Sequence, residues 1–271
     1  MQGSSRVSLT ELQEFLAGQY QDAAATDLSA SGDTLLNLVP VLEKERSLRT
    51  TLADSSLSAE AKTGIVDKLL GEQSTLAVST VKNVVSKRWS SDEDFVDAVE
   101  YAGDSLVLMA AEKDGHIGEV EEEIFRFGRA IDANADLQMA LTNPASSADE
   151  KSGIVRSLLE GKTNQATSKL IGHSVESLRG RRVQDAVAGL SQLAAERRGQ
   201  TIAEVRSAIE LTDEQRDRLA AVLSKQVGRD VELNIIVDPA IIGGLQVLID
   251  GELIDGSASS KLEQARRKLA G

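Results

Sequence analysis

The spacing of apolar residues is helical over about the first 200 positions of the chain and alternates beyond them. The stretch SAEAKTGIVDKLL at 58–70 repeats apolar residues three and four positions apart, and SADEKSGIVRSLL at 147–159 does the same. Such spacing places the apolar side chains on one face of a helix. The pattern therefore predicts a mainly helical region, with a further helix around Ser8–Gln19 before it.

The two quoted stretches are copies of one unit, because eight of their thirteen positions are identical at an offset of 89 residues. The apolar pairs that keep this offset upstream are Leu35 with Ile124, Leu38 with Phe127, Leu42 with Ile131, Leu48 with Leu137 and Leu52 with Leu141. Downstream, AAEKDG at 110–115 matches AAERRG at 194–199, and Glu119-Val120 matches Glu204-Val205. We infer a duplicated helical unit that covers about 33–120 and again about 122–205.

The two copies differ in charge and in their prolines. Residues 33–120 carry a net charge of −7 and residues 122–205 a net charge of zero, which indicates either drift on a solvated surface or copies that face different partners. Pro40 predicts a kink or break in the first copy only, since proline removes a helix hydrogen bond. In the second copy Pro144 ends a helix, and Ser147 with Glu150 forms a capping box that starts the next one.

Beyond residue 200 the apolar positions alternate, which is typical of strands. The first predicted strand places Ala203, Val205, Ile209 and Leu211 on one face. Thr212 and Gln215 then form a capping box that opens a helix. The apolar positions of that helix are Leu219, Val222, Leu223 and Val227, and Gly228 ends it. Two further strands are predicted at Val231–Val237 and Leu245–Ile249.

The stretch VDPAIIGGLQVLIDGELIDGS at 237–257 is interpreted as a series of turns. Asp238-Pro239 is a turn signal, and Gly243-Gly244 leads into a strand, whereas a phosphate-binding loop leads into a helix. Asp250 and Asp255 lie in separate later turns, too far apart for a calcium loop. A last amphipathic helix is predicted to follow, with Ser257 as its N-cap.

These patterns predict an α+β fold that is predominantly α, with two tandem helical-bundle repeats followed by a small C-terminal α/β domain with a short sheet. The predicted domains are 1–120, with the N-terminal helix and the first repeat, 121–200, with the second repeat, and 201–271.

Composition narrows the possible partners and compartments. The chain has 271 residues, no cysteine and a net charge of −13, so disulfides and thiolate sites are excluded. Residues 1–150 carry a net charge of −15, which disfavours nucleic acid and anionic lipid as partners. The basic cluster of Arg179, Arg181 and Arg182 is interpreted as a solvated helix end. No secretory signal and no apolar run long enough for a bilayer are present, so direct membrane insertion is not expected.

No constellation of residues points to catalysis, and no metal or cofactor site is predicted. Gly161-Lys162-Thr163 matches the end of a P-loop, but Arg156 stands where the first glycine is required, so this segment is interpreted as a helix C-terminus. His116 and His173 lie in different copies without a local second ligand, and both are expected to be structural.

A set of motifs occurs in order near the end of the chain: Val205-Arg206-Ser207-Ala208, Leu211-Thr212, Asp238-Pro239, Gly243-Gly244 and Asp255-Gly256-Ser257. Together they resemble the C-terminal region of the delta subunit of F-type ATP synthases, whose mitochondrial relative is the oligomycin-sensitivity-conferring protein. Upstream, 141–144 and Gly180-Arg181 resemble positions of the helical domain of that family. The resemblance covers about 122–271, and residues 33–120 form an additional copy.

The resemblance implies a non-catalytic stator subunit, peripheral at the cytoplasmic face of the cell membrane within a hetero-oligomer. The helical domain of such proteins docks on the N-terminal segments of the alpha subunits, and the C-terminal domain binds the peripheral-stalk b subunits. Proton-driven rotation is thereby coupled to ATP synthesis. The candidate contact residues are Ile241, Ile242, Leu262 and Leu269, and the favoured alternative for these side chains is packing in the core.

Two alternatives remain open at this stage. One is a free-standing helical-repeat adaptor that binds amphipathic helices of another complex. The other is an enzyme that uses the Gly161-Lys162-Thr163 segment to bind a nucleotide.

Overall fold

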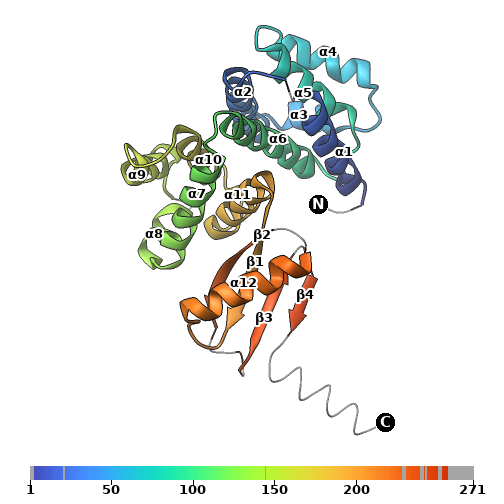
Figure 1. Cartoon of the computed structure of the whole chain (residues 1–271). Coiled ribbons are helices and arrows are strands. Elements are labelled where there is room, and N and C mark those ends of the chain that lie inside the picture. The colour runs from blue at the N-terminus through green and yellow to red at the C-terminus, as the bar shows by residue number, and fades with distance from the viewer. Residues whose placement is uncertain are drawn as a thin grey trace, which may run out of the picture. The chain divides into compact units, whose positions relative to one another are not determined.

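The computed structural model describes residues 3–20, 22–143, 145–227, 230–238, 241, 243–249 and 252–255. The chain forms two compact units, Met1–Ala194 and Ala195–Gly271. The first contains both helical repeats, and the second contains the sheet (Figure 1). The predicted class, predominantly α with a small C-terminal sheet, is confirmed.

The helices of the first unit follow one another with short connections. In chain order they are α1 (Ser4–Gln19), α2 (Ala25–Lys44), α3 (Arg46–Ala53), α4 (Ala59–Leu70), α5 (Thr75–Ser86), α6 (Asp92–Lys113), α7 (Ile117–Asp132), α8 (Ala135–Thr142), α9 (Ala148–Leu159), α10 (Gln165–Glu176) and α11 (Val183–Arg198). The predicted N-terminal helix is therefore confirmed as α1, which begins four residues earlier than expected.

The duplication appears helix by helix, with α2–α6 matched by α7–α11. The limits of α3 and α4 return in α8 and α9 at the offset of 89 residues found in the sequence. Ser58 and Ser147 cap α4 and α9 in the same way, because each side-chain oxygen accepts the N–H three residues later at 3.2 Å. The capping box of Ser147 with Glu150 is confirmed.

The duplicated unit ends earlier than the sequence match implied. Gly115 and Gly199 close the last helix of each copy with φ of 77° and 81°, a left-handed conformation that favours glycine. Glu119 then lies in α7, whereas its partner Glu204 lies in a strand. The short match beyond the glycines thus aligned a helix with a strand, and that part of the prediction is wrong.

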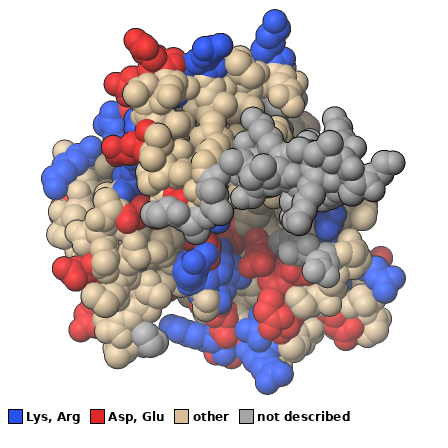
Figure 2. Space-filling model, turned by 90° about the horizontal axis from the view of Figure 1, so that it is seen from below, with Lys and Arg blue, Asp and Glu red and all other residues tan. Residues whose placement is uncertain are grey.

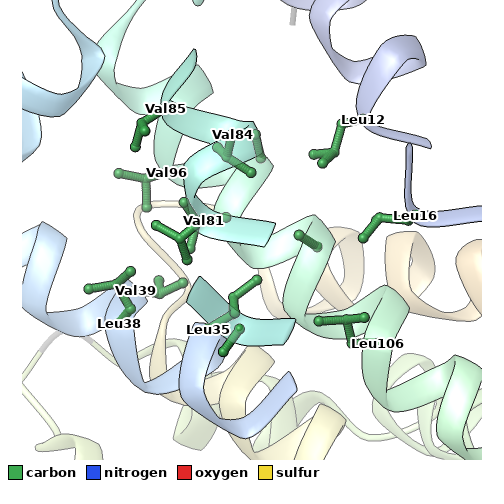
Figure 3. Packing of buried hydrophobic residues seen from close by; sticks show 14 of the residues in the cluster. Leu12, Leu16, Leu35, Leu38, Val39, Val81, Val84, Val85, Val96 and Leu106 are labelled. Atoms are coloured by element: carbon green, nitrogen blue, oxygen red, sulfur yellow. The ribbon is translucent and has the colours of Figure 1, made fainter. Parts of the chain in front are cut away.

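Helix α6 belongs to two hydrophobic cores. Fifteen of its 22 residues are buried. Phe95, Val99 and Leu106 lie in the core of the first repeat, together with residues from α1, α2 and α5 (Figure 3). Leu108 and Ala111, further along α6, lie in the core of the second repeat. The two repeats therefore share a helix and form one unit.

Helices α2 and α6 cross at two glycines. A Cβ atom at Gly32 would lie 2.6 Å from Cγ2 of Val107 and 3.0 Å from the carbonyl oxygen of Gly103. A Cβ atom at Gly103 would lie 2.7 Å from Cδ2 of Leu36. The close approach of these two helices therefore depends on the missing side chains.

Of the kink or break predicted at Pro40, the break does not occur, because α2 continues from Ala25 to Lys44 with Pro40 inside it. The proline removes one backbone hydrogen bond. Val39 and Leu42 on either side are fully buried, and their packing holds the helix in place.

The second unit is a mixed sheet with one helix. Its elements are β1 (Gln200–Ser207), α12 (Asp213–Val227), β2 (Asp230–Val237), β3 (Leu245–Ile249) and β4 (Glu252–Asp255). The strand order is β2-β1-β3-β4, in which β1 and β2 are parallel and the other pairs are antiparallel. The core contains Ala203, Val205, Leu223, Val231, Val247 and Ile249.

The predicted strands and the helix that follows Thr212 are confirmed, with two corrections to the apolar faces. The capping box of Thr212 with Gln215 is present. However, β1 ends at Ser207, so Ile209 lies beyond the sheet and is 68% exposed. Val222 is 56% exposed because α12 turns Leu223 toward the core instead.

The turn that follows β2 is also confirmed where it is described. The N–H of Ile241 donates to the carbonyl of Asp238 at 3.1 Å. Gly243 and Gly244 have φ of 68° and 83°, which explains the glycine pair. The predictions at Pro144, Gly228, Pro239, Asp250-Gly251 and 256–271 lie outside the described residues.

We predict that Gly32→Ala destabilises the chain by about 1–3 kcal/mol, because the new methyl group meets backbone as well as the Val107 side chain. Urea unfolding of the whole chain measures the change. Gly64→Ala is the control, since a Cβ atom there meets nothing within 4 Å and alanine favours the helix. Equal stability of the two variants would contradict the close α2–α6 contact.

Candidate functional sites

The residues predicted to contact partners are mostly outside the described part of the chain. Ile241 is half-buried in the turn after β2. Ile242, Leu262 and Leu269 lie outside the described residues. This set of contacts therefore stays a prediction.

The segment that resembles a P-loop closes a helix. Helix α9 ends at Leu159, and Gly161 has a φ of 70°. The ammonium group of Lys162 donates to the carbonyl of Leu158 at 3.2 Å, and the hydroxyl of Thr163 donates to the carbonyl of Leu159 at 3.1 Å. These residues satisfy the free carbonyl groups at the helix end, as the sequence predicted.

The two histidines have different surroundings. His116 is exposed, and its Nδ1 lies 3.1 Å from the carboxylate of Glu119. The His173 side chain is 10% exposed, and its Nε2 lies 3.6 Å from Oε1 of Glu100. Among the described residues, no group of three or more histidines and carboxylates is arranged to hold a metal ion.

His173 belongs to a buried charge cluster between the two repeats. The guanidinium of Arg179 pairs with Glu100, with Asp97 at 2.7 Å and with Glu43 at 3.4 Å. Arg181 pairs with the other carboxylate oxygen of Glu100 at 2.8 Å. We call this set of Glu43, Asp97, Glu100, Asp104, His173, Arg179 and Arg181 the inter-repeat cluster.

The prediction of a solvated helix end is wrong for two of the three arginines. The Arg179 side chain is only 15% exposed, and that of Arg181 is 36% exposed. Arg179 and Gly180 have φ of 49° and 77°, so the loop after α10 turns the arginines toward α6. Of the three, only Arg182 is a solvated residue, 74% exposed, and it pairs with Asp185 in the first turn of α11.

Burial and charge act in opposite directions on the carboxyl groups of the cluster. Burial alone favours neutral Glu100, but His173 and the two guanidinium groups outweigh it and lower the pKa of Glu100 to about 2. Burial raises the pKa of Asp104 well above its usual value, and the negative charge of Glu100 raises it further. One oxygen of Asp104, Oδ1, is buried without a hydrogen-bond partner.

The sheet of the second unit has an apolar pair on its outer face. Leu248 of β3 and Leu253 of β4 are cross-strand partners and are 42% and 63% exposed. Their neighbours Val247 and Ile249 point to the other face, into the core. Glu204 lies next to Leu248 on the outer face and pairs with Arg206 at 2.9 Å.

Charges elsewhere on the surface are mixed. On the face shown in Figure 2, lysine and arginine side chains alternate with aspartate and glutamate and form no continuous basic surface. Within the described residues, no helix is both long enough and apolar enough to cross a membrane.

The sequence model of the ATP synthase delta (OSCP) subunit matches residues 98–269, more than half of the chain. The chain belongs to the ATP synthase delta (OSCP) subunit family. It is thus a non-catalytic stator subunit of ATP synthase, which links the peripheral stalk to the catalytic head.

Full-length relatives share the additional repeat. The chain is 40% identical over 271 residues to ATP synthase subunit delta of Streptomyces coelicolor, covering 100% of this chain and 98% of the relative. It is 38% identical over 272 residues to that of Thermobifida fusca, covering 100% of both chains. A chain from the mitochondrial ATP synthase hexamer of Toxoplasma gondii is 16% identical with a TM-score of 0.45, covering 62% of this chain and 95% of that chain.

The family match begins inside α6, the helix that both cores share. Within the helical unit the match covers most of α6 together with α7–α11. Helices α1–α5 lie before that match, but the alignments with full-length delta subunits include them.

We predict that Asp104→Asn stabilises this delta subunit at neutral pH by about 1–3 kcal/mol, because asparagine stays neutral where a buried carboxyl lacks a partner. The folded-state pKa of Asp104 lies above its usual 3.8, so the parent chain loses stability as pH rises above that value toward the folded-state pKa. Urea unfolding at pH 5 and pH 8 should show a gain that is larger at the higher pH. The exposed Asp22→Asn is the control, and a gain independent of pH would contradict a raised pKa.

Proposed function

We propose that the helical unit of this delta subunit binds the N-terminal segments of the alpha subunits, and that the C-terminal unit binds the peripheral-stalk b subunits. The subunit then lies peripherally at the cytoplasmic face of the cell membrane as part of the complex. Family membership supports this assignment. The division of the chain into two compact units supports it too, because a link between two bodies needs two binding regions.

The observation that carries the stalk contact is the apolar pair Leu248 and Leu253. A sheet with one face on its core usually has a polar outer face. Here two adjacent leucines stay exposed, one on β3 and one on the edge strand β4. The apolar face of an amphipathic stalk helix is a suitable occupant, since helices of this kind bind apolar surfaces through residues three and four positions apart.

We predict that Leu248→Asp with Leu253→Asp weakens binding of the full-length subunit to the soluble part of the b subunits by at least about tenfold, or about 1.4 kcal/mol. Titration calorimetry measures the change. Val222→Asp is the matched control, because it places a charge at an exposed apolar position of α12, which packs on the opposite face of the sheet. Unchanged stalk binding by the double variant would exclude the outer sheet face as the contact.

Binding to the catalytic head needs an experiment that keeps the chain whole. Deletion of 33–120 would remove α6 and with it part of the second core. Hydrogen exchange of the intact subunit, with and without a peptide of the alpha N-terminal segment, locates the contact without deletion. Protection confined to helices of one repeat would identify the docking repeat. A folded subunit that binds neither the head nor the peptide would contradict the proposed contact with the alpha N-terminal segments.

A further inference from the structure

We infer that the inter-repeat cluster fixes the angle between the two helical repeats by pairing acids of the first copy with bases of the second. This inference concerns the helical unit alone and does not rest on the partners proposed above.

Each copy supplies one sign of charge. The acidic members, Glu43, Asp97, Glu100 and Asp104, come from α2 and α6 of the first copy. The basic members Arg179 and Arg181, together with His173, come from α10 and the loop after it in the second copy. The cluster is thus a contact between the copies and not within either one.

Several members of the cluster have no charged counterpart in the other copy. In the register set by the matching motifs at 110–115 and 194–199, Glu100 corresponds to Gln184 and Asp104 corresponds to Ala188. Asn83 stands in α5 where His173 stands in α10. The charges therefore arose after duplication or were lost from one copy. Either history leaves opposite charges where the repeats meet.

The position of the cluster makes it a brace, by which we mean a contact that holds the two repeats at a fixed angle. Glu100 lies on the first half of α6, about two helical turns before Leu108, which lies in a stretch where residues of the two cores alternate along the helix. The loop after α10 reaches back from the second repeat to Glu100. A change in the angle between α10 and α6 would therefore pull Arg179 and Arg181 away from Glu100.

A second bridge holds α10 to the first repeat. The ammonium group of Lys169 lies 2.6 Å from Oδ2 of Asp33 and 3.2 Å from Oγ of Ser29, both on α2. Lys169 is one helical turn before His173, so one side of α10 carries contacts to both α2 and α6. These two contacts lie at separate points on α10, so together they resist rotation as well as bending of the second repeat relative to the first.

Because Glu100 is buried, separating it from Arg179 and Arg181 requires free energy. The Glu100 side chain is only 7% exposed. Removal of its bases leaves an uncompensated buried charge, which disfavours the open arrangement more strongly than loss of a surface pair would. The left-handed φ of Arg179, unusual for a residue other than glycine, is maintained by its three carboxylate partners.

The absence of cysteine makes a direct test of the brace possible. Lys68→Cys and Ser157→Cys place spin labels at equivalent exposed positions of α4 and α9, one in each repeat. Pulsed electron resonance on the full chain then gives the distribution of distances between the repeats. A second pair, Ser157→Cys with Asp136→Cys, reports on the second repeat alone.

We predict that Glu100→Gln broadens the distance distribution between the repeats and leaves that within the second repeat narrow. Asp97→Asn removes a half-exposed partner of Arg179 and should broaden the between-repeat distribution less. This variant also allows the test to be made if Glu100→Gln does not fold. Arg182→Gln, in the same loop but paired only with Asp185, is the matched control and should change nothing. A between-repeat distribution that stays as narrow as the parent's in folded Glu100→Gln would overturn the inference, because α6 alone would then set the angle.

Discussion

The burial of α6 on both sides is the constraint on which the helical unit depends. A helix that supplies Phe95 and Leu106 to one core and Leu108 and Ala111 to the next cannot belong to one repeat alone. A domain boundary drawn at residue 120 would therefore divide a unit whose two cores have a helix in common. The duplication produced two bundles in series, and the shared helix made them one body, since neither core closes without it.

The same constraint gives a physical reading of the charge difference between the copies. A solvated face would tolerate any charge, and drift would then explain net charges of −7 and zero. The carboxyl groups of Glu100 and Asp104 are buried, however, and Glu100 meets bases from the other copy. Part of the difference is therefore located at the contact between the repeats, and it needs no outside partner. Asp104 does not share this explanation, because burial and the negative charge of Glu100 both favour its neutral form and raise its pKa.

The sequence predicted features that depend on residues close together in the chain. It missed those that depend on residues far apart in the chain. The pattern located β3, and the capping box located the start of α9, to the residue, since their determinants lie within a few positions. Arg179 was misread because its carboxylate partners stand about 80–135 positions earlier in the chain, and only the folded bundle brings them together. Pro40 does not break α2, and Val222 faces solvent, because tertiary packing overrode a local rule. The resemblance of Gly180-Arg181 to family positions was the one local feature of the sequence that pointed to the loop after α10.

The motifs that resembled ligand-binding or catalytic sites, where the structure describes them, have structural roles in a subunit that transmits force. Lys162 and Thr163 close a helix, and Gly243 and Gly244 turn the chain into β3. His173 stands beside the buried carboxylate of Glu100 in the contact between the repeats. A stator must resist displacement between its two ends, and buried ion pairs give directional contacts that apolar packing does not. Apolar surface is left exposed on the outer sheet face, where a partner helix could replace the water that now covers it.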